Sequence, residues 1–186
     1  MALDLPCLAA VYMKNRVHKG WTKLSAESYQ TNPISETDKM TFRPQLVQVL
    51  TVASPATRVQ FTSMLSKIIR SDYPHDWPEF TDLTLNLLHS TQISEVYSGL
   101  TMLNELTKLY RWKSGDNRIG LDAVMTNIFP VALQIAGKLL AESTAAAGAM
   151  LVHILKSYKA AIAVTTEFLW SDCSWNYRRN FRKIQF

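Results

Sequence analysis

The sequence has few of the residues that build disulfide-stabilised, metal-binding or catalytic sites. It contains two cysteines, Cys7 and Cys173, and four histidines, all far apart along a chain of 186 residues. This spacing indicates neither a disulfide framework nor a zinc site and favours a reducing compartment. Glycine-rich phosphate loops, Gly-x-Ser-x-Gly elbows and His-Glu-x-x-His motifs are also missing. We therefore expect no enzyme, no metal and no cofactor.

Long apolar runs and a strong charge of one sign are missing as well. The longest apolar run, 145–155, contains His153 and is too short for a spanning helix, so we expect no membrane span. The net charge is +5, from 20 Lys and Arg against 15 Asp and Glu, and this modest excess does not by itself indicate a nucleic-acid or membrane partner. Asp4 stands where a secretion signal carries positive charge, which argues against secretion.

What the sequence does have is apolar residues at helical spacing. Hydrophobic residues make up 47% of the chain, enough for one sizeable core. They recur every three or four positions, and no β-hairpin signal interrupts them. We predict helices over residues 5–18, 39–52, 55–70, 77–89, 93–110, 121–142 and 144–162.

Several residues mark where these helices begin or bend. Ser54 followed by Pro55 predicts a cap and a first-turn proline. Asp76, with Glu79 three residues later, predicts an N-cap for a helix that begins at Trp77 and folds back on the helix before it. Pro130 should kink the long helix over 121–142 by removing a hydrogen bond.

The spacing also predicts which side chains are buried. In the first helix, Leu8 and Tyr12 belong to the apolar stripe, and Asn15 extends the same stripe. Trp77 and Trp112 lie at helix ends, where large aromatic side chains commonly close the contact between neighbouring helix pairs.

The helices recur with a repeating period. Every second helix starts near residues 5, 55, 93 and 144, and each interval holds two helices. The intervals bracket the roughly 40 to 47 residues of HEAT-type repeats. We therefore predict an all-α fold, a right-handed α-solenoid of antiparallel helix pairs of the HEAT or armadillo type. Such repeats bury their apolar faces only against their neighbours, so an uncapped end exposes one.

The last residues do not continue this pattern. Residues 165–186 form an atypical tail that ends in WNYRRNFRKIQF, where basic and aromatic residues alternate. This composition could stack bases and neutralise phosphates. Because the tail lacks an apolar stripe, we expect it to be disordered or foreign to the repeats, and nucleic acid is disfavoured as a partner.

Three segments carry a family likeness. AAVYMKNRVHKGW at 9–21, RVQFTSMLSKIIRSDYPHDWPEF at 58–80 and LNELTKLYRWKSG at 103–115 resemble the N-terminal domain of importin-β family nuclear transport receptors, or karyopherins, with the importin seven/eight branch the most similar. The resemblance assigns 1–164 to an importin-β N-terminal-type HEAT-repeat region. It also implies a truncated start, because the family has further helices ahead of this one.

The resemblance implies a role in protein import into the nucleus and shuttling between cytoplasm and nucleus through the pore. The implied partners are the GTP form of the small GTPase Ran, Phe-Gly nucleoporins, and protein cargo bound by repeats that are missing here. In the family, the second helix of each early pair contributes to the Ran-binding surface. Carried over to this chain, the polar positions that we expect to be exposed and to contact Ran are Arg43, Gln45, Glu79, Asp82 and Asn86.

Other interpretations remain open at the level of sequence. Each of these five residues could equally be solvated helix surface. The repeats could form a generic HEAT scaffold for another protein complex that never meets Ran. The tail could make the chain a nucleic-acid binder, in which case binding to RNA would depend on salt and on residues 171–186.

Overall fold

The computed structural model of the chain describes residues 5–22, 32–113 and 118–163. Within these ranges every regular element is an α-helix, so the predicted all-α fold is confirmed. The sequence-predicted tail lies outside the described residues. The helices are α1 (Leu5–Gly20), α2 (Glu36–Val52), α3 (Pro55–Asp72), α4 (Phe80–Leu88), α5 (Ile93–Tyr110), α6 (Ile119–Asn127), α7 (Phe129–Leu139) and α8 (Ala145–Ile162).

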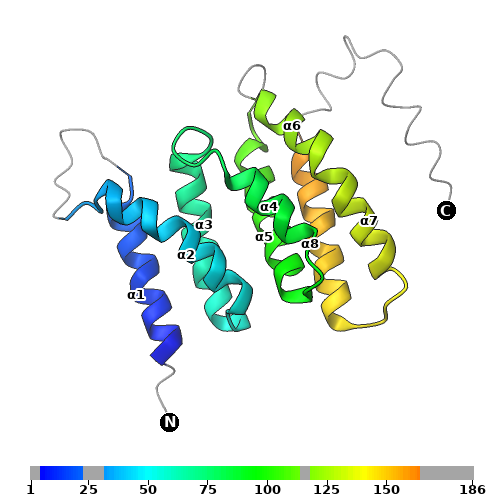
Figure 1. Cartoon of the computed structure of the whole chain (residues 1–186), viewed down its shortest axis with the longest axis horizontal. Coiled ribbons are helices and arrows are strands. Elements are labelled where there is room, and N and C mark those ends of the chain that lie inside the picture. Colours follow the sequence, from blue (N-terminus) through cyan, green and yellow to red (C-terminus); the bar gives the residue numbers. More distant parts are fainter. Residues whose placement is uncertain (1–4, 23–31, 114–117, 164–186) are drawn as a thin grey trace.

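The helices are stacked in two layers (Figure 1). Helices α1, α3, α5 and α8 lie side by side in one row, each packed on the next, and we call this row the A layer. Helices α2, α4, α6 and α7 form the second row, the B layer. The A-layer helices begin close to the predicted period. In the B layer, α4 packs mainly on α5 and α7 mainly on α8, so the closest pairs differ from the α3 and α4 pair predicted from the short connection.

Hydroxyl side chains begin three of the helices. The Ser54 Oγ accepts a hydrogen bond from the Thr57 N–H at 3.4 Å, and Pro55 opens α3, which confirms the predicted cap. The Ser35 Oγ accepts from the Asp38 N–H at 3.1 Å, so α2 begins three residues before its predicted start. Thr144 caps α8 in the same way. These caps satisfy N–H groups that have no partner inside the helix.

The start of α4 differs from the prediction. The N–H groups of Asp76 and Trp77 both donate to the carbonyl of Asp72, at 2.7 and 3.1 Å. This turn closes the end of α3, so Asp76 does not act as an N-cap and α4 begins at Phe80, without a side-chain cap. The predicted helix over 121–142 is likewise divided into α6 and α7 at Ile128, with Pro130 in the first turn of α7.

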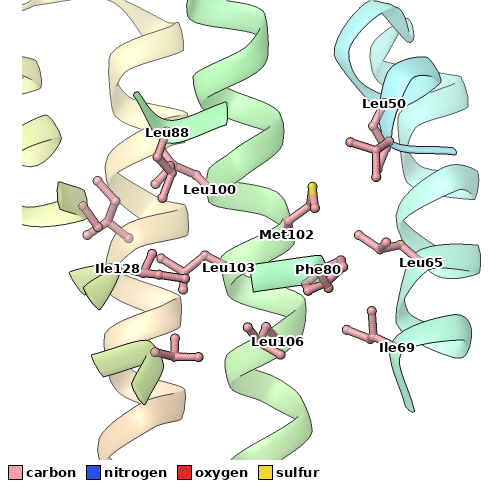
Figure 2. Close-up of a cluster of buried hydrophobic side chains, with 14 of the residues drawn as sticks. Leu50, Leu65, Ile69, Phe80, Leu88, Leu100, Met102, Leu103, Leu106 and Ile128 are labelled. Carbon is pink, nitrogen blue, oxygen red and sulfur yellow. The ribbon is translucent and has the colours of Figure 1, made fainter. Parts of the chain in front are cut away.

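One hydrophobic core runs through the stack (Figure 2). Phe80 lies between α3 and α5, and its ring meets Trp77 edge-on with centroids 4.9 Å apart. Helices α4 and α5 approach closely at Gly99, where a Cβ atom would lie 3.0 Å from a methyl carbon of Leu88. Other members of this core are Leu50, Leu65, Ile69, Leu100, Met102, Leu103, Leu106 and Ile128.

The buried face of α1 is not the predicted one. Leu8 and Tyr12 are 52% and 72% exposed, and Asn15 is exposed too. The buried residues of α1, which packs on α3, are instead Ala10, Val17 and Gly20. The larger apolar side chains of α1 therefore lie on a face that no described helix covers.

The aromatic residues at helix ends divide into a buried and an exposed group. Trp77 is buried, as predicted, whereas the prediction for Trp112 is wrong, because 77% of this residue is exposed and the Arg111 guanidinium lies 4.8 Å from its ring. Tyr73 meets both Tyr110 and Phe80 edge-on. Burial raises the pKa of both phenols, so they remain neutral near neutral pH.

A histidine joins the last two A-layer helices. The His153 Nε2 of α8 lies 3.2 Å from the hydroxyl of Tyr97 on α5. The Arg58 guanidinium of α3 lies 4.7 Å from the centre of the Tyr97 ring. Burial lowers the pKa of His153 below its usual value, and the charges of Lys156 and Lys108 lower it further, while Glu105 opposes them. The folded chain therefore disfavours protonation of this ring.

This histidine should make stability depend on pH. Below about pH 6.5 the unfolded chain binds a proton at His153 more readily than the folded chain does, so the free energy of unfolding should fall on acidification through this window. Above this pH window, His153 is neutral in both the folded and the unfolded chain, so it no longer makes stability depend on pH. We expect His153→Leu to reduce the proton uptake linked to unfolding by up to about one proton. Urea titrations between pH 5 and pH 8 measure the free energy of unfolding at each pH. If this free energy depended on pH equally in the wild type and in His153→Leu, the prediction would be contradicted.

Candidate functional site: the exposed face of the B layer

Three of the five predicted contact residues form one exposed stripe along α4. Glu79, Asp82 and Asn86 are spaced by three and four positions, which places their side chains on one face of a helix. All three are exposed, while Phe80, Thr84 and Leu88 on the other side are buried. The apolar half of α4 packs on α5, and its polar half is available to a partner.

The other two predicted contact residues lie on α2, and only one of them is exposed. Gln45 is exposed, as expected. Arg43 is only 7% exposed, so the expectation that it lies on the surface is wrong. Its position follows the buried stripe of α2, three residues before Leu46 and seven before Leu50. We therefore remove Arg43 from the candidate surface and keep the other four residues.

Arg43 belongs to a buried polar cluster that joins three helices. Its Nε and Nη2 donate to one carboxylate oxygen of Asp72, at 2.8 and 2.7 Å. The Trp21 Nε1 donates to the same carboxylate at 3.0 Å. Because Asp72 ends α3, Arg43 lies in α2 and Trp21 follows α1, this carboxylate fixes both helices relative to α3. Sequence reasoning missed this cluster, which we call the Asp72 cluster.

Charge is distributed unequally between the layers. In the A layer, α1 contains Lys and Arg and α8 contains Lys, and neither helix contains Asp or Glu. Helices α4 and α6 of the B layer contain Asp82 and Asp122, both exposed, and no Lys or Arg. Asp82 also adds to the raised pKa of Tyr73, after burial, which places its negative charge close to the turn before α4. The exposed B-layer face therefore offers carboxylates to a partner with basic residues.

The described residues offer binding chemistry more readily than reaction chemistry. Within 5–22, 32–113 and 118–163, no group of three or more His, Cys, Asp or Glu side chains is arranged to hold a metal ion. None of the helices in these ranges has the length and apolar character needed to cross a membrane. The exposed carboxylates and amides of α2 and α4 instead suit noncovalent docking of a protein surface.

Comparison with known proteins places this helical stack in a family. No family model matches the chain. The importin beta-like SAD2 homolog of Arabidopsis thaliana is 33% identical over 132 residues, which covers 71% of this chain and 12% of that protein. Human importin-8 is 29% identical over 157 residues, covering 83% of this chain and 15% of importin-8. The chain belongs to the importin-β family. It spans 12% and 15% of the length of these two curated relatives.

Both transport directions occur among the importin-β family relatives. Human exportin-2 is 25% identical over 136 residues, covering 68% of this chain and 14% of exportin-2. Among solved structures, the exportin Cse1 in its cargo-free, cytoplasmic state superposes with a TM-score of 0.65 at 16% sequence identity, over 98% of this chain and 20% of Cse1. This likeness confirms the helical solenoid fold. The chain is thus a HEAT-repeat region of the kind found in importins and exportins.

Proposed function

We propose that this chain is the Ran-GTP-binding HEAT-repeat region of a nuclear transport receptor that acts in protein import. The observation that carries the proposal is the exposed stripe Glu79, Asp82 and Asn86 on α4, with Gln45 on α2, in a chain of the importin-β family. Carboxylates on such a stripe would steer and hold a basic surface of the GTPase. Import is favoured over export because the importin relatives are more similar than exportin-2.

The same role implies further partners and a location, all of which are part of the proposal. The receptor would bind protein cargo and Phe-Gly nucleoporins and would shuttle between cytoplasm and nucleus. It would bind and release these partners without catalysing a reaction. Dissociation of cargo would follow from the binding of Ran-GTP, so the nucleotide on Ran would set the direction of transport.

A retention experiment tests the proposal. The chain is immobilised and offered Ran loaded with GTP or with GDP, and we expect retention of the GTP form only. Equal retention of both forms, or of neither, would reject Ran binding and favour a HEAT scaffold for another complex.

Charge reversal locates the contact. The double variant Glu79→Lys and Asp82→Lys should weaken binding of Ran-GTP by at least about tenfold, because it places like charges against a basic partner surface. The single variant Glu95→Lys, at the start of α5 in the A layer, is the control and should change binding by less than about twofold. Titrations by surface plasmon resonance measure both, and an equal loss in the control would exclude the B-layer face as the contact.

A further inference from the structure

A second candidate binding site lies in the A layer, away from the face proposed for Ran. Helices α1, α3 and α5 enclose an open groove of about 430 Å³. Every residue that lines the groove carries a polar side chain. These residues are His18 of α1, Thr62, Ser63, Ser66, Lys67 and Arg70 of α3, and Glu105 of α5.

The groove has free positive charge. Lys67 and Arg70 are one helical turn apart on α3, and within the described residues neither makes an ion pair. The single carboxylate of the groove, Glu105, is 6% exposed and is paired with Lys108 of its own helix. Its negative charge is therefore offset before a ligand arrives, and the ammonium and guanidinium groups determine the charge that the groove presents.

The rim of the groove is held in place and is surrounded by further basic residues. The His18 Nε2 lies 3.1 Å from the Ser63 Oγ, which joins α1 to α3 at the groove. Helix α1 adds Lys14, one helical turn before His18, and has no acidic residue. A ligand with carboxylates would thus meet two donors inside the groove and a positive field around it.

We propose that the groove between α1, α3 and α5 binds a short acidic segment of a partner protein, with carboxylates that accept from Lys67 and Arg70. The hydroxyl group of Ser66 supplies a further donor to the same segment. Charge complementarity selects this occupant. The groove also has no aromatic lining residue on which a nucleic-acid base could stack. This site is independent of Ran binding.

The test uses a short fluorescent peptide rich in glutamate and the same peptide with glutamine in each glutamate position. Fluorescence anisotropy with the full chain should detect binding of the glutamate peptide only, and binding should weaken as salt is raised. Failure of the glutamate peptide to bind, or equal binding of the glutamine peptide, would overturn the proposal.

Two double variants with the same change in charge locate the peptide. Lys67→Glu with Arg70→Glu should weaken binding by at least about tenfold, whereas Lys156→Glu with Lys159→Glu on α8, outside the groove, should weaken it by less than about threefold. Equal losses would indicate a diffuse field and would overturn a defined site. If the first variant does not fold, Lys67→Gln with Arg70→Gln replaces it. An RNA oligonucleotide that binds wild type more tightly than the peptide, and that loses binding in the groove variant, would also overturn it.

Discussion

Asp72→Ala should be the most damaging single polar substitution in this chain. The carboxylate is 3% exposed and accepts hydrogen bonds from both Arg43 and Trp21. Removing it leaves a buried guanidinium without a counter-charge and a buried indole N–H without an acceptor. The loss of one partner of a buried ion pair typically costs about 3 to 5 kcal/mol, and we expect a decrease in the free energy of unfolding of this size.

Two further variants separate the missing charge from the missing volume. Asp72→Asn keeps the shape and one acceptor but not the charge, so its free energy of unfolding should lie between those of the wild type and Asp72→Ala. The double variant Arg43→Met with Asp72→Leu removes the unpaired guanidinium and should recover part of the loss, while the Trp21 N–H still lacks an acceptor. Urea titrations followed by circular dichroism measure all three. A loss below about 1 kcal/mol for Asp72→Ala would mean that Arg43 reaches water in the folded chain.

Phe80→Ala should have the second large effect. The ring is fully buried and fills the space where α4 meets α3 and α5 (Figure 2). Truncating a buried Phe to Ala removes its transfer free energy and leaves a cavity, which together cost about 3 to 5 kcal/mol. Stability in a repeat stack depends on contacts between neighbours, so this cavity should also uncouple α1, α2 and α3 from the helices that follow.

The readout for Phe80→Ala is the shape of the urea unfolding curve. We expect one transition for the wild type and two for the variant, as the two parts of the stack unfold separately. Tyr12→Ala is a matched aromatic control, because Tyr12 is 72% exposed on α1, and it should change the free energy of unfolding by less than about 0.5 kcal/mol. Comparable losses for the two variants would contradict the placement of the core.

The sequence predicts the strongly periodic helices well and the weakly periodic ones less well. Helix α5 has a continuous apolar stripe, and its predicted limits agree with the structure. Helix α1 has apolar residues on more than one face, and the spacing favours the larger ones, Leu8 and Tyr12. In the stack, however, α1 packs on α3 and buries Ala10 and Val17 instead. The spacing of apolar residues alone does not predict which face of α1 is buried.

Spacing relative to the buried residues also explains where the predicted contact residues lie. Glu79, Asp82 and Asn86 lie opposite the apolar side of α4, and this pattern can be read from the chain. The charge of Arg43 favours a position at the surface, although its spacing from Leu46 and Leu50 places it on the buried side. Its partner Asp72 is 29 residues away, so the pairing arises only when α2 and α3 pack. The A-layer groove is likewise lined by residues of three helices, so no pattern within one helix predicts it.

Carboxylate footprinting tests most directly the claim that the B layer is the docking face for Ran-GTP. Exposed carboxylates of the native chain are labelled with a carbodiimide and an amine, alone and with Ran in either nucleotide state, and the labelled positions are identified by mass spectrometry. We expect Glu79 and Asp82 to be protected only by Ran-GTP, while Glu95 in the A layer is labelled equally in all samples. Protection of Glu95 without protection of Glu79 and Asp82, or no nucleotide-dependent protection at all, would contradict the account.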